Sequence, residues 1–132
     1  MSDSREELVR EIYARWNQGD RDTNPEEIHP DAVVYSAMTG DTFRGLDGVR
    51  RWMAEIDEQF DDWMLTIEEV RNVPGDRLLV LGEVHFRGRA SGVEFDQAMG
   101  WLIEFEAARI TALHNIVGHE AAIEAAELAT NS

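Results

Sequence analysis

The 132-residue chain is predicted to fold as one α+β domain that spans residues 1–132. Two observations support this class. Amphipathic helical patterns fill most of the first half, and four long segments with β character, separated by turn residues, follow in the second half. Helices that precede a run of consecutive strands are typical of domains in which the helices pack on a face of a mainly antiparallel sheet.

The first helix is predicted from a capping box and an apolar stripe. Ser4–Glu7 fits the box, in which a serine and a glutamate cap the first turn reciprocally. Leu8, Ile12 and Trp16 then recur every four residues and so lie on one helical face. We expect this helix to end near Gly19.

Two further helices and a strand are predicted before residue 61. Asn24–Glu27 places proline at a first helical position, which predicts a short helix up to about His29. Ala32–Met38 is a predicted strand, followed by a turn at Thr39–Asp41. Gly45–Gly48 leads into a longer helix, whose buried face is expected to carry Val49, Trp52, Met53, Ile56 and Phe60.

The second half of the sequence has β character and ends in a helix. The predicted strands are Met64–Val73, Arg77–Arg89, Val93–Phe105 and Arg109–Val117, with short turns between them. Residues Glu120–Ala129 are rich in Ala, Glu and Leu, which predicts a terminal helix.

Composition excludes several classes of function. The formal net charge of −15 repels phosphates, so we expect no nucleic-acid partner. All twelve basic residues are arginine, which removes lysine Schiff-base chemistry, and the lack of cysteine removes thiolate chemistry. No apolar run approaches the roughly 20 residues that span a bilayer, and the start is acidic. We therefore expect a cytoplasmic protein without a membrane partner.

Five segments occur in an order that resembles a known superfamily. They are Trp16–Asp20, His29–Val33, Phe43–Val49, Gly75–Val80 and Ala108–Thr111. In this order they resemble the SnoaL-like and ketosteroid-isomerase-like superfamily, which has the nuclear-transport-factor-2-like cone fold. The resemblance implies helices packed on a strongly curved, mainly antiparallel sheet that forms a conical pocket. It also implies a homodimer formed through the convex face of the sheet, to which Val80, Val84 and Phe86 would contribute if they faced outward.

The catalytic residues of the ketosteroid isomerases are not matched. Their tyrosine position falls at Ile12, their base at Ser36 and their protonated acid at about Gly100. These side chains cannot carry out the proton transfers of that reaction. Steroid-type isomerisation is therefore not expected, although the fold resemblance stands, because one fold hosts many chemistries.

Two other activities of the superfamily are matched incompletely. The acidic residue of SnoaL-like cyclases falls at about Gly118, so His119 or Glu120 could replace it only with a shifted register. Limonene-type epoxide hydrolases use an aspartate–arginine–aspartate group with tyrosine and asparagine. Residues of these types occur here at a different spacing: Arg87, Asp96, Tyr35 and Asn115.

One predicted strand has an unusually polar face. Glu83 and His85 alternate with Val84 and Phe86, so the two pairs face opposite sides of the sheet. The resemblance points Glu83 and His85 inward, about 7 Å apart. In that arrangement His85 could act as base or acid while Glu83 orients it. The alternative is that this face is solvated and Val84 and Phe86 point inward.

Three tryptophans and an asparagine are the candidate ligand-binding residues. Core packing is the first explanation of the spacing of Trp16, Trp52 and Trp101, and in a cone fold they could also line an apolar cavity. On the last strand His114 and Asn115 alternate, so only one of them can face the cone. The resemblance implies that Asn115 is the inward one. An inward asparagine could bind a substrate carbonyl, or could be a structural amide.

We expect neither a metal nor a cofactor. The four histidines lack paired metal-ligand spacing, and His29 and His119 lie at predicted helix edges. The leading hypothesis is a protein that binds a small apolar, carbonyl-bearing molecule, with cofactor-free proton transfer of the isomerase, cyclase or hydrolase type by His85 and Glu83. The alternative is a non-catalytic ligand-binding or dimeric scaffold protein.

Overall fold

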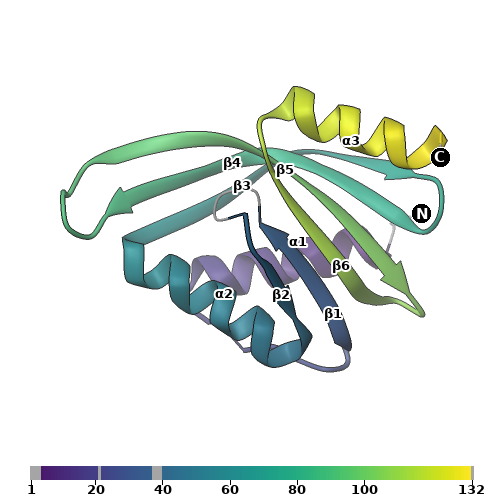
Figure 1. The fold of residues 1–132 in the computed structure, drawn as a ribbon, viewed down its shortest axis with the longest axis horizontal. Coiled ribbons are helices and arrows are strands. Elements are labelled where there is room, and N and C mark those ends of the chain that lie inside the picture. The colour runs from purple at the N-terminus through teal and green to yellow at the C-terminus, as the bar shows by residue number, and fades with distance from the viewer. Residues whose placement is uncertain (1–3, 21, 37–39, 132) are drawn as a thin grey trace.

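A six-stranded, strongly curved sheet carries two helices on its concave face and one on its convex face (Figure 1). The computed structural model describes residues 4–20, 22–36 and 40–131. Its helices are α1 (Ser4–Asn17), α2 (Gly45–Gln59) and α3 (His119–Asn131). Its strands are β1 (Ile28–Ser36), β2 (Thr42–Arg44), β3 (Phe60–Val73), β4 (Arg77–Gly88), β5 (Glu94–Glu106) and β6 (Arg109–Val117).

The sheet is antiparallel except at one junction. Its strand order is β2-β1-β6-β5-β4-β3, and the β1–β6 pair is parallel. The register of β3 against β4 shifts between Ile67 and Glu69, opposite Gly82. A Cβ at Gly82 would lie 1.9 Å from the Thr66 carbonyl oxygen. Only glycine allows this close approach of two backbones, which accompanies the bend of the sheet.

The main core lies between the concave face and the first two helices. The buried residues of α1 are Val9, Ile12, Tyr13 and Trp16. Leu8, which the four-residue spacing places on the same stripe, is only partly buried. From α2 the side chains of Val49, Trp52 and Met53 join the same cluster. The concave face of the sheet adds further aromatic and branched side chains to this cluster.

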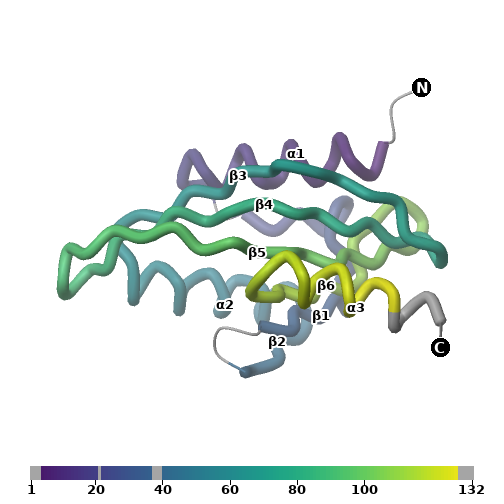
Figure 2. The backbone as a smooth tube through the Cα atoms, turned by 90° about the horizontal axis from the view of Figure 1, so that it is seen from above, coloured from purple at the N-terminus to yellow at the C-terminus, as the bar shows by residue number. Residues whose placement is uncertain are grey.

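A smaller core lies under α3 on the convex face. Figure 2 shows α3 lying over β5 and β6. The close contact is at Gly100, where an added Cβ would lie 2.1 Å from the Cβ of Ala122. Around this contact Leu79, Leu81 and Leu102 pack against the alanines of the helix.

The predicted α+β class and curved sheet are confirmed, with local corrections. The short helix predicted over Asn24–His29 is wrong, because Asn24 Oδ1 accepts the Glu26 amide at 2.9 Å and its carbonyl accepts the Ile28 amide, which closes a turn into β1. Strand β2 was not predicted. The predicted positions Met38 and Thr39 lie outside the described residues. No helix within the described ranges combines the length and apolar character needed to cross a membrane.

Candidate functional site

The predicted ligand-binding residues come together inside the cone. Trp16 from α1, Trp52 from α2, Trp101 from β5 and Asn115 from β6 line one internal cavity of about 30 Å³. Trp101 and Asn115 are paired across neighbouring strands, and Asn115 pairs with Ser36 of β1 in turn. Because these residues share the inward side of three adjacent strands, they form the floor of the interior.

Aromatic rings fill most of this interior. Tyr13 stacks on Trp16 at a centroid distance of 5.4 Å and meets Trp101 edge to face at 5.3 Å. Trp16 meets Trp52 edge to face at 6.1 Å. A second cavity, of about 20 Å³, borders Tyr13, Trp16 and Trp52. Each space holds a water molecule or two at most.

Four polar atoms in this interior lack a hydrogen-bond partner among the described residues. They are Tyr13 Oη, Trp52 Nε1, Asn115 Oδ1 and Ser36 Oγ, all on side chains that are nearly fully buried. By contrast, Trp63 Nε1, which borders the same cavity, donates to Asp57 Oδ1 at 2.8 Å. Burial raises the pKa of Tyr13 well above its usual value, so its hydroxyl stays a neutral donor.

The inward direction that the resemblance implies for Glu83 and His85 is wrong, and the alternative, with Val84 and Phe86 pointing inward, is the one observed. Val84 and Phe86 are 4% and 3% exposed and belong to the main core, so Glu83 and His85 lie on the opposite, convex face. The apolar stripes of α1 and α2 require apolar partners on the concave face, and Val84 and Phe86 meet that requirement. The acid–base role thus loses its geometric basis in the cone, and Val80, Val84 and Phe86 cannot form an outward dimer patch.

His85 instead forms a surface cluster with two carboxylates of β5. Its Nδ1 is 2.6 Å from Asp96 Oδ1 and its Nε2 is 3.1 Å from Glu94 Oε1. These hydrogen bonds, the one to Asp96 first, raise the pKa of His85 above its usual value. Its side chain is 41% exposed, so this cluster contacts water and not an enclosed substrate.

The epoxide-hydrolase-type residues do not assemble. Asp96 of β5 bonds to His85 of β4, and Arg87 lies opposite Glu94 on the same two strands. Tyr35 and Asn115 lie elsewhere, at the β1–β6 junction. No group of three or more His, Cys, Asp or Glu side chains in the described part of the chain is placed to hold a metal ion.

The two remaining edge histidines make local hydrogen bonds. His29 Nδ1 accepts the Asp31 amide at 3.0 Å, and His119 Nε2 lies 2.7 Å from the Gly82 carbonyl oxygen. The second contact ties the start of α3 to the bend in β4. Both side chains are accounted for by the fold.

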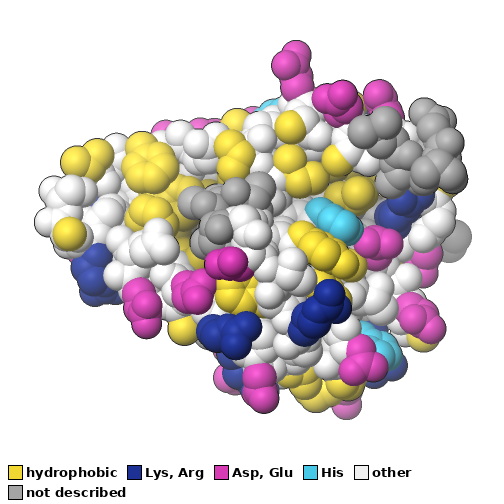
Figure 3. Space-filling view, in the orientation of Figure 1, with side chains coloured by type: hydrophobic (Ala, Val, Ile, Leu, Met, Phe, Trp, Pro, Cys, Tyr) yellow, Lys and Arg dark blue, Asp and Glu magenta, His cyan; other side chains and the backbone are white. Residues whose placement is uncertain are grey.

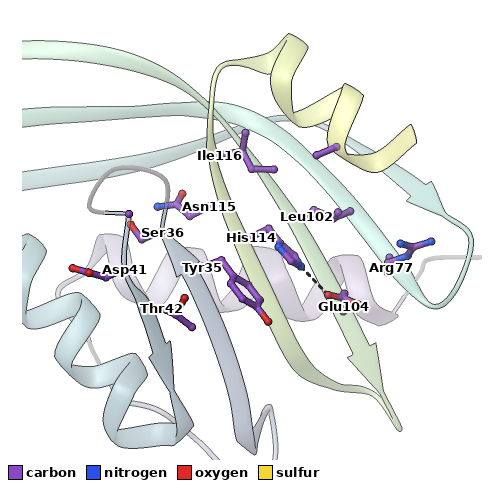
Figure 4. A pocket seen from close by; sticks show the side chains of 12 residues that line it. Tyr35, Ser36, Asp41, Thr42, Arg77, Leu102, Glu104, His114, Asn115 and Ile116 are labelled. Carbon is purple, nitrogen blue, oxygen red and sulfur yellow. Dashed lines mark hydrogen bonds and ion pairs between the residues drawn. The ribbon is translucent and has the colours of Figure 1, made fainter. Parts of the chain in front are cut away.

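Sequence reasoning missed an open groove on the outer face of the sheet (Figure 4). It lies between α3 and the β1–β2 end of the sheet and has a volume of about 510 Å³. Tyr35 and His114 stack in it at 4.6 Å, with ring planes 9° apart, and His114 bonds to Glu104. No local sequence pattern predicts this groove, because Tyr35 and His114 are brought together only by the parallel pairing of β1 with β6.

The curved sheet, the two helices in its hollow and the aromatic interior define a protein of the nuclear-transport-factor-2-like cone class. Within that class, the SnoaL-like domain family matches residues 9–113, and the chain therefore belongs to this family. No curated protein matches the chain.

Solved structures with the same fold share little sequence with this chain. An NTF2-like protein from Burkholderia pseudomallei is 19% identical with a TM-score of 0.80, covering 93% of this chain and 97% of that one. TerC, co-crystallised with polyporic acid, is 19% identical with a TM-score of 0.78, and the match covers 95% of this chain and 99% of TerC. A protein with ketosteroid isomerase-like fold from Catenulispora acidiphila, in complex with trimethylamine, is 18% identical with a TM-score of 0.72, covering 92% of both chains. At these identities the likeness shows the fold.

Proposed function

We propose that this protein binds a small molecule with a flat apolar body and carbonyl or hydroxyl groups in the concave interior of the cone. The observation that carries the proposal is the set of unpartnered polar atoms buried among aromatic rings. Ligand sites have this composition: an apolar lining with a few polar groups that fix orientation.

The polar atoms suit a ligand of this chemistry. A buried hydroxyl or amide without a partner costs roughly 1–3 kcal/mol of stability. Tyr13 Oη and Trp52 Nε1 can donate to a ligand carbonyl, whereas Asn115 Oδ1 can accept from a ligand hydroxyl. A ligand that makes these bonds removes a cost that the empty protein bears.

The interior favours binding over proton-transfer catalysis. The described residues that line the two inner cavities include no Asp, Glu, His, Lys or Arg. Tyr13 is their one ionisable tyrosine, and its raised pKa keeps it protonated. Of the two functions that the sequence suggests, non-catalytic ligand binding is therefore the one we propose.

Binding requires the interior to open. Small-molecule pockets measure about 300–1,000 Å³, against about 30 Å³ here. Met99 is a flexible side chain that borders this cavity and can move aside. Beyond it, Phe95 and Val117 are 42% and 40% exposed, and Figure 3 shows hydrophobic side chains gathered over the outstretched end of β4 and β5. This end is the proposed entrance.

Isothermal titration calorimetry with polyporic acid, 1-indanone and 2-naphthol tests the proposal. Polyporic acid is included because TerC was co-crystallised with it. We expect at least one probe to bind, and Tyr13→Phe and Asn115→Leu to weaken it about 2-fold to 10-fold per lost hydrogen bond. His85→Ala, on the convex face, is the matched control and should bind as the wild type does. The proposal would be overturned if no probe bound. It would also be overturned if Tyr13→Phe and Asn115→Leu both bound a probe as tightly as the wild type does.

A further inference from the structure

The outer groove has the dimensions of a ligand site and is separate from the cone interior. Its volume of about 510 Å³ lies within the range of small-molecule pockets. Leu102 and Ile116 of the sheet, with Ala125 of α3, form an apolar side of the groove. Thr42 and Asp41 border the other side (Figure 4). All of these side chains lie outside the two inner cavities.

A pair of stacked rings lies within the groove. Tyr35 and His114 are almost parallel, with centroids 4.6 Å apart. Tyr35 is 40% exposed although it is a large aromatic side chain. An exposed ring already stacked on one face offers a surface on which a planar ring can lie in an offset or edge-to-face contact.

The other partner of His114 determines its hydrogen-bonding character. Its Nε2 lies 2.8 Å from Glu104 Oε2, and an ionised carboxylate only accepts, so Nε2 carries the proton in this pair. In the neutral ring Nδ1 is then an acceptor, and no described residue donates to it. The groove therefore offers an acceptor to a ligand O–H or N–H group.

Charge selects against an anionic ligand. Asp41 and Glu104 both border the groove, whereas its one cationic side chain among the described residues, Arg77, donates through Nε to the Pro74 carbonyl oxygen. The chain as a whole carries a formal net charge of −15. Such a field raises the local concentration of cations and lowers that of anions.

The outer groove and the cone interior come close to each other at the ends of β1 and β6. Ser36 Oγ and Asn115 Oδ1 are buried without a partner among the described residues, and both side chains border this groove at the end of β1. Asn115 thus separates the outer groove from the interior of the cone.

We propose that the outer groove is a second binding site, for a neutral or cationic planar aromatic molecule that carries an O–H or N–H donor. The aromatic ring packs on Tyr35, and the donor bonds to Nδ1 of His114, which Glu104 holds in place. A surface ion pair alone would contribute little. Here the pair orients an acceptor beside an exposed ring in a groove of ligand size.

Tyramine and 4-hydroxyphenylacetate test the proposal, because both carry a phenol and they differ in the sign of the side-chain charge. In ¹H–¹⁵N NMR titrations of the full chain we expect tyramine to shift the amides of Tyr35, His114 and their neighbours. 4-Hydroxyphenylacetate should bind at least about 10-fold more weakly. Equal binding of the two, or shifts confined to the cone interior, would overturn the proposal.

Variants separate this site from the one in the cone. Tyr35→Leu and Glu104→Gln should each weaken tyramine about 10-fold while the thermal midpoint stays near that of the wild type. Tyr13→Phe should leave tyramine binding unchanged, because Tyr13 lies in the interior. Unchanged tyramine binding in both groove variants would overturn the proposal. So would a homodimer of the wild type that dissociates in Tyr35→Leu, because the groove would then be occupied by a second copy of the chain.

Discussion

Tyr13→Phe is predicted to stabilise the empty protein while weakening its ligand. Tyr13 is 4% exposed, and its hydroxyl has lost water without gaining a partner among the described residues. An unsatisfied buried hydroxyl costs about 1–3 kcal/mol. The substitution keeps the ring and its contacts with Trp16 and Trp101, so the free energy of unfolding should rise by about 1 kcal/mol. For a domain of this size that is roughly 4 °C in Tm.

Urea denaturation measures this change, with Tyr35→Phe as the matched control. Tyr35 is 40% exposed, so loss of its hydroxyl should change stability by less than about 0.5 kcal/mol. A saturating cone ligand should reduce or remove this stability gain, because only the wild type donates the Tyr13 hydrogen bond. A loss of 1 kcal/mol or more in empty Tyr13→Phe would show that the hydroxyl already has a partner, and would refute the reasoning.

Three further predictions concern packing, pH and assembly. Gly100→Ala should lower the free energy of unfolding in urea by about 1–3 kcal/mol, because its Cβ would lie 2.1 Å from that of Ala122. Adding Ala122→Gly to this variant should restore part of the loss. A Gly100→Ala variant as stable as the wild type would contradict the packing of α3. In an NMR titration His85 should have a pKa above its usual value of 6.5, and Asp96→Asn should lower that pKa. Because the pKa is raised in the folded state, the contribution of His85 to stability is fully present below pH 6.5 and is lost as the pH rises through the folded-state pKa. An unshifted His85 would show that the surface cluster does not persist in solution. The family resemblance predicts a homodimer, and sedimentation velocity showing a monomer at high micromolar concentration would contradict it.

The class of fold could be read from the sequence because periodicity reports burial directly. The four-residue recurrence in α1 and the turn residues around β4 and β5 predicted those elements nearly to their observed ends. By contrast, β3 begins at Phe60, which was predicted to lie on the preceding helix, and not at Met64. The Asn24–Glu27 segment misled because asparagine followed by proline begins a tight turn as readily as a helix. Strand β2 is three residues long, too short for a period to be recognised.

The candidate site was predicted in part. The three tryptophans and Asn115 meet at one cavity because each lies on the buried side of its element. Alternation along β4 separated Glu83 and His85 from Val84 and Phe86, but a period of two does not say which set faces the helices. The stacked pair in the outer groove joins residues 79 positions apart, from Tyr35 to His114, through a parallel pairing that no local pattern reveals.

The indole N–H signals of the tryptophans test the proposed interior site most directly. Trp52 Nε1 has no partner among the described residues, whereas Trp63 Nε1 donates to Asp57 at 2.8 Å. In ¹H–¹⁵N spectra, with each indole assigned by a Trp→Phe variant, we predict that a bound carbonyl ligand moves the Trp52 signal downfield and leaves the Trp63 signal nearly in place. A ligand that binds tightly without moving the Trp52 signal would contradict a binding site inside the cone.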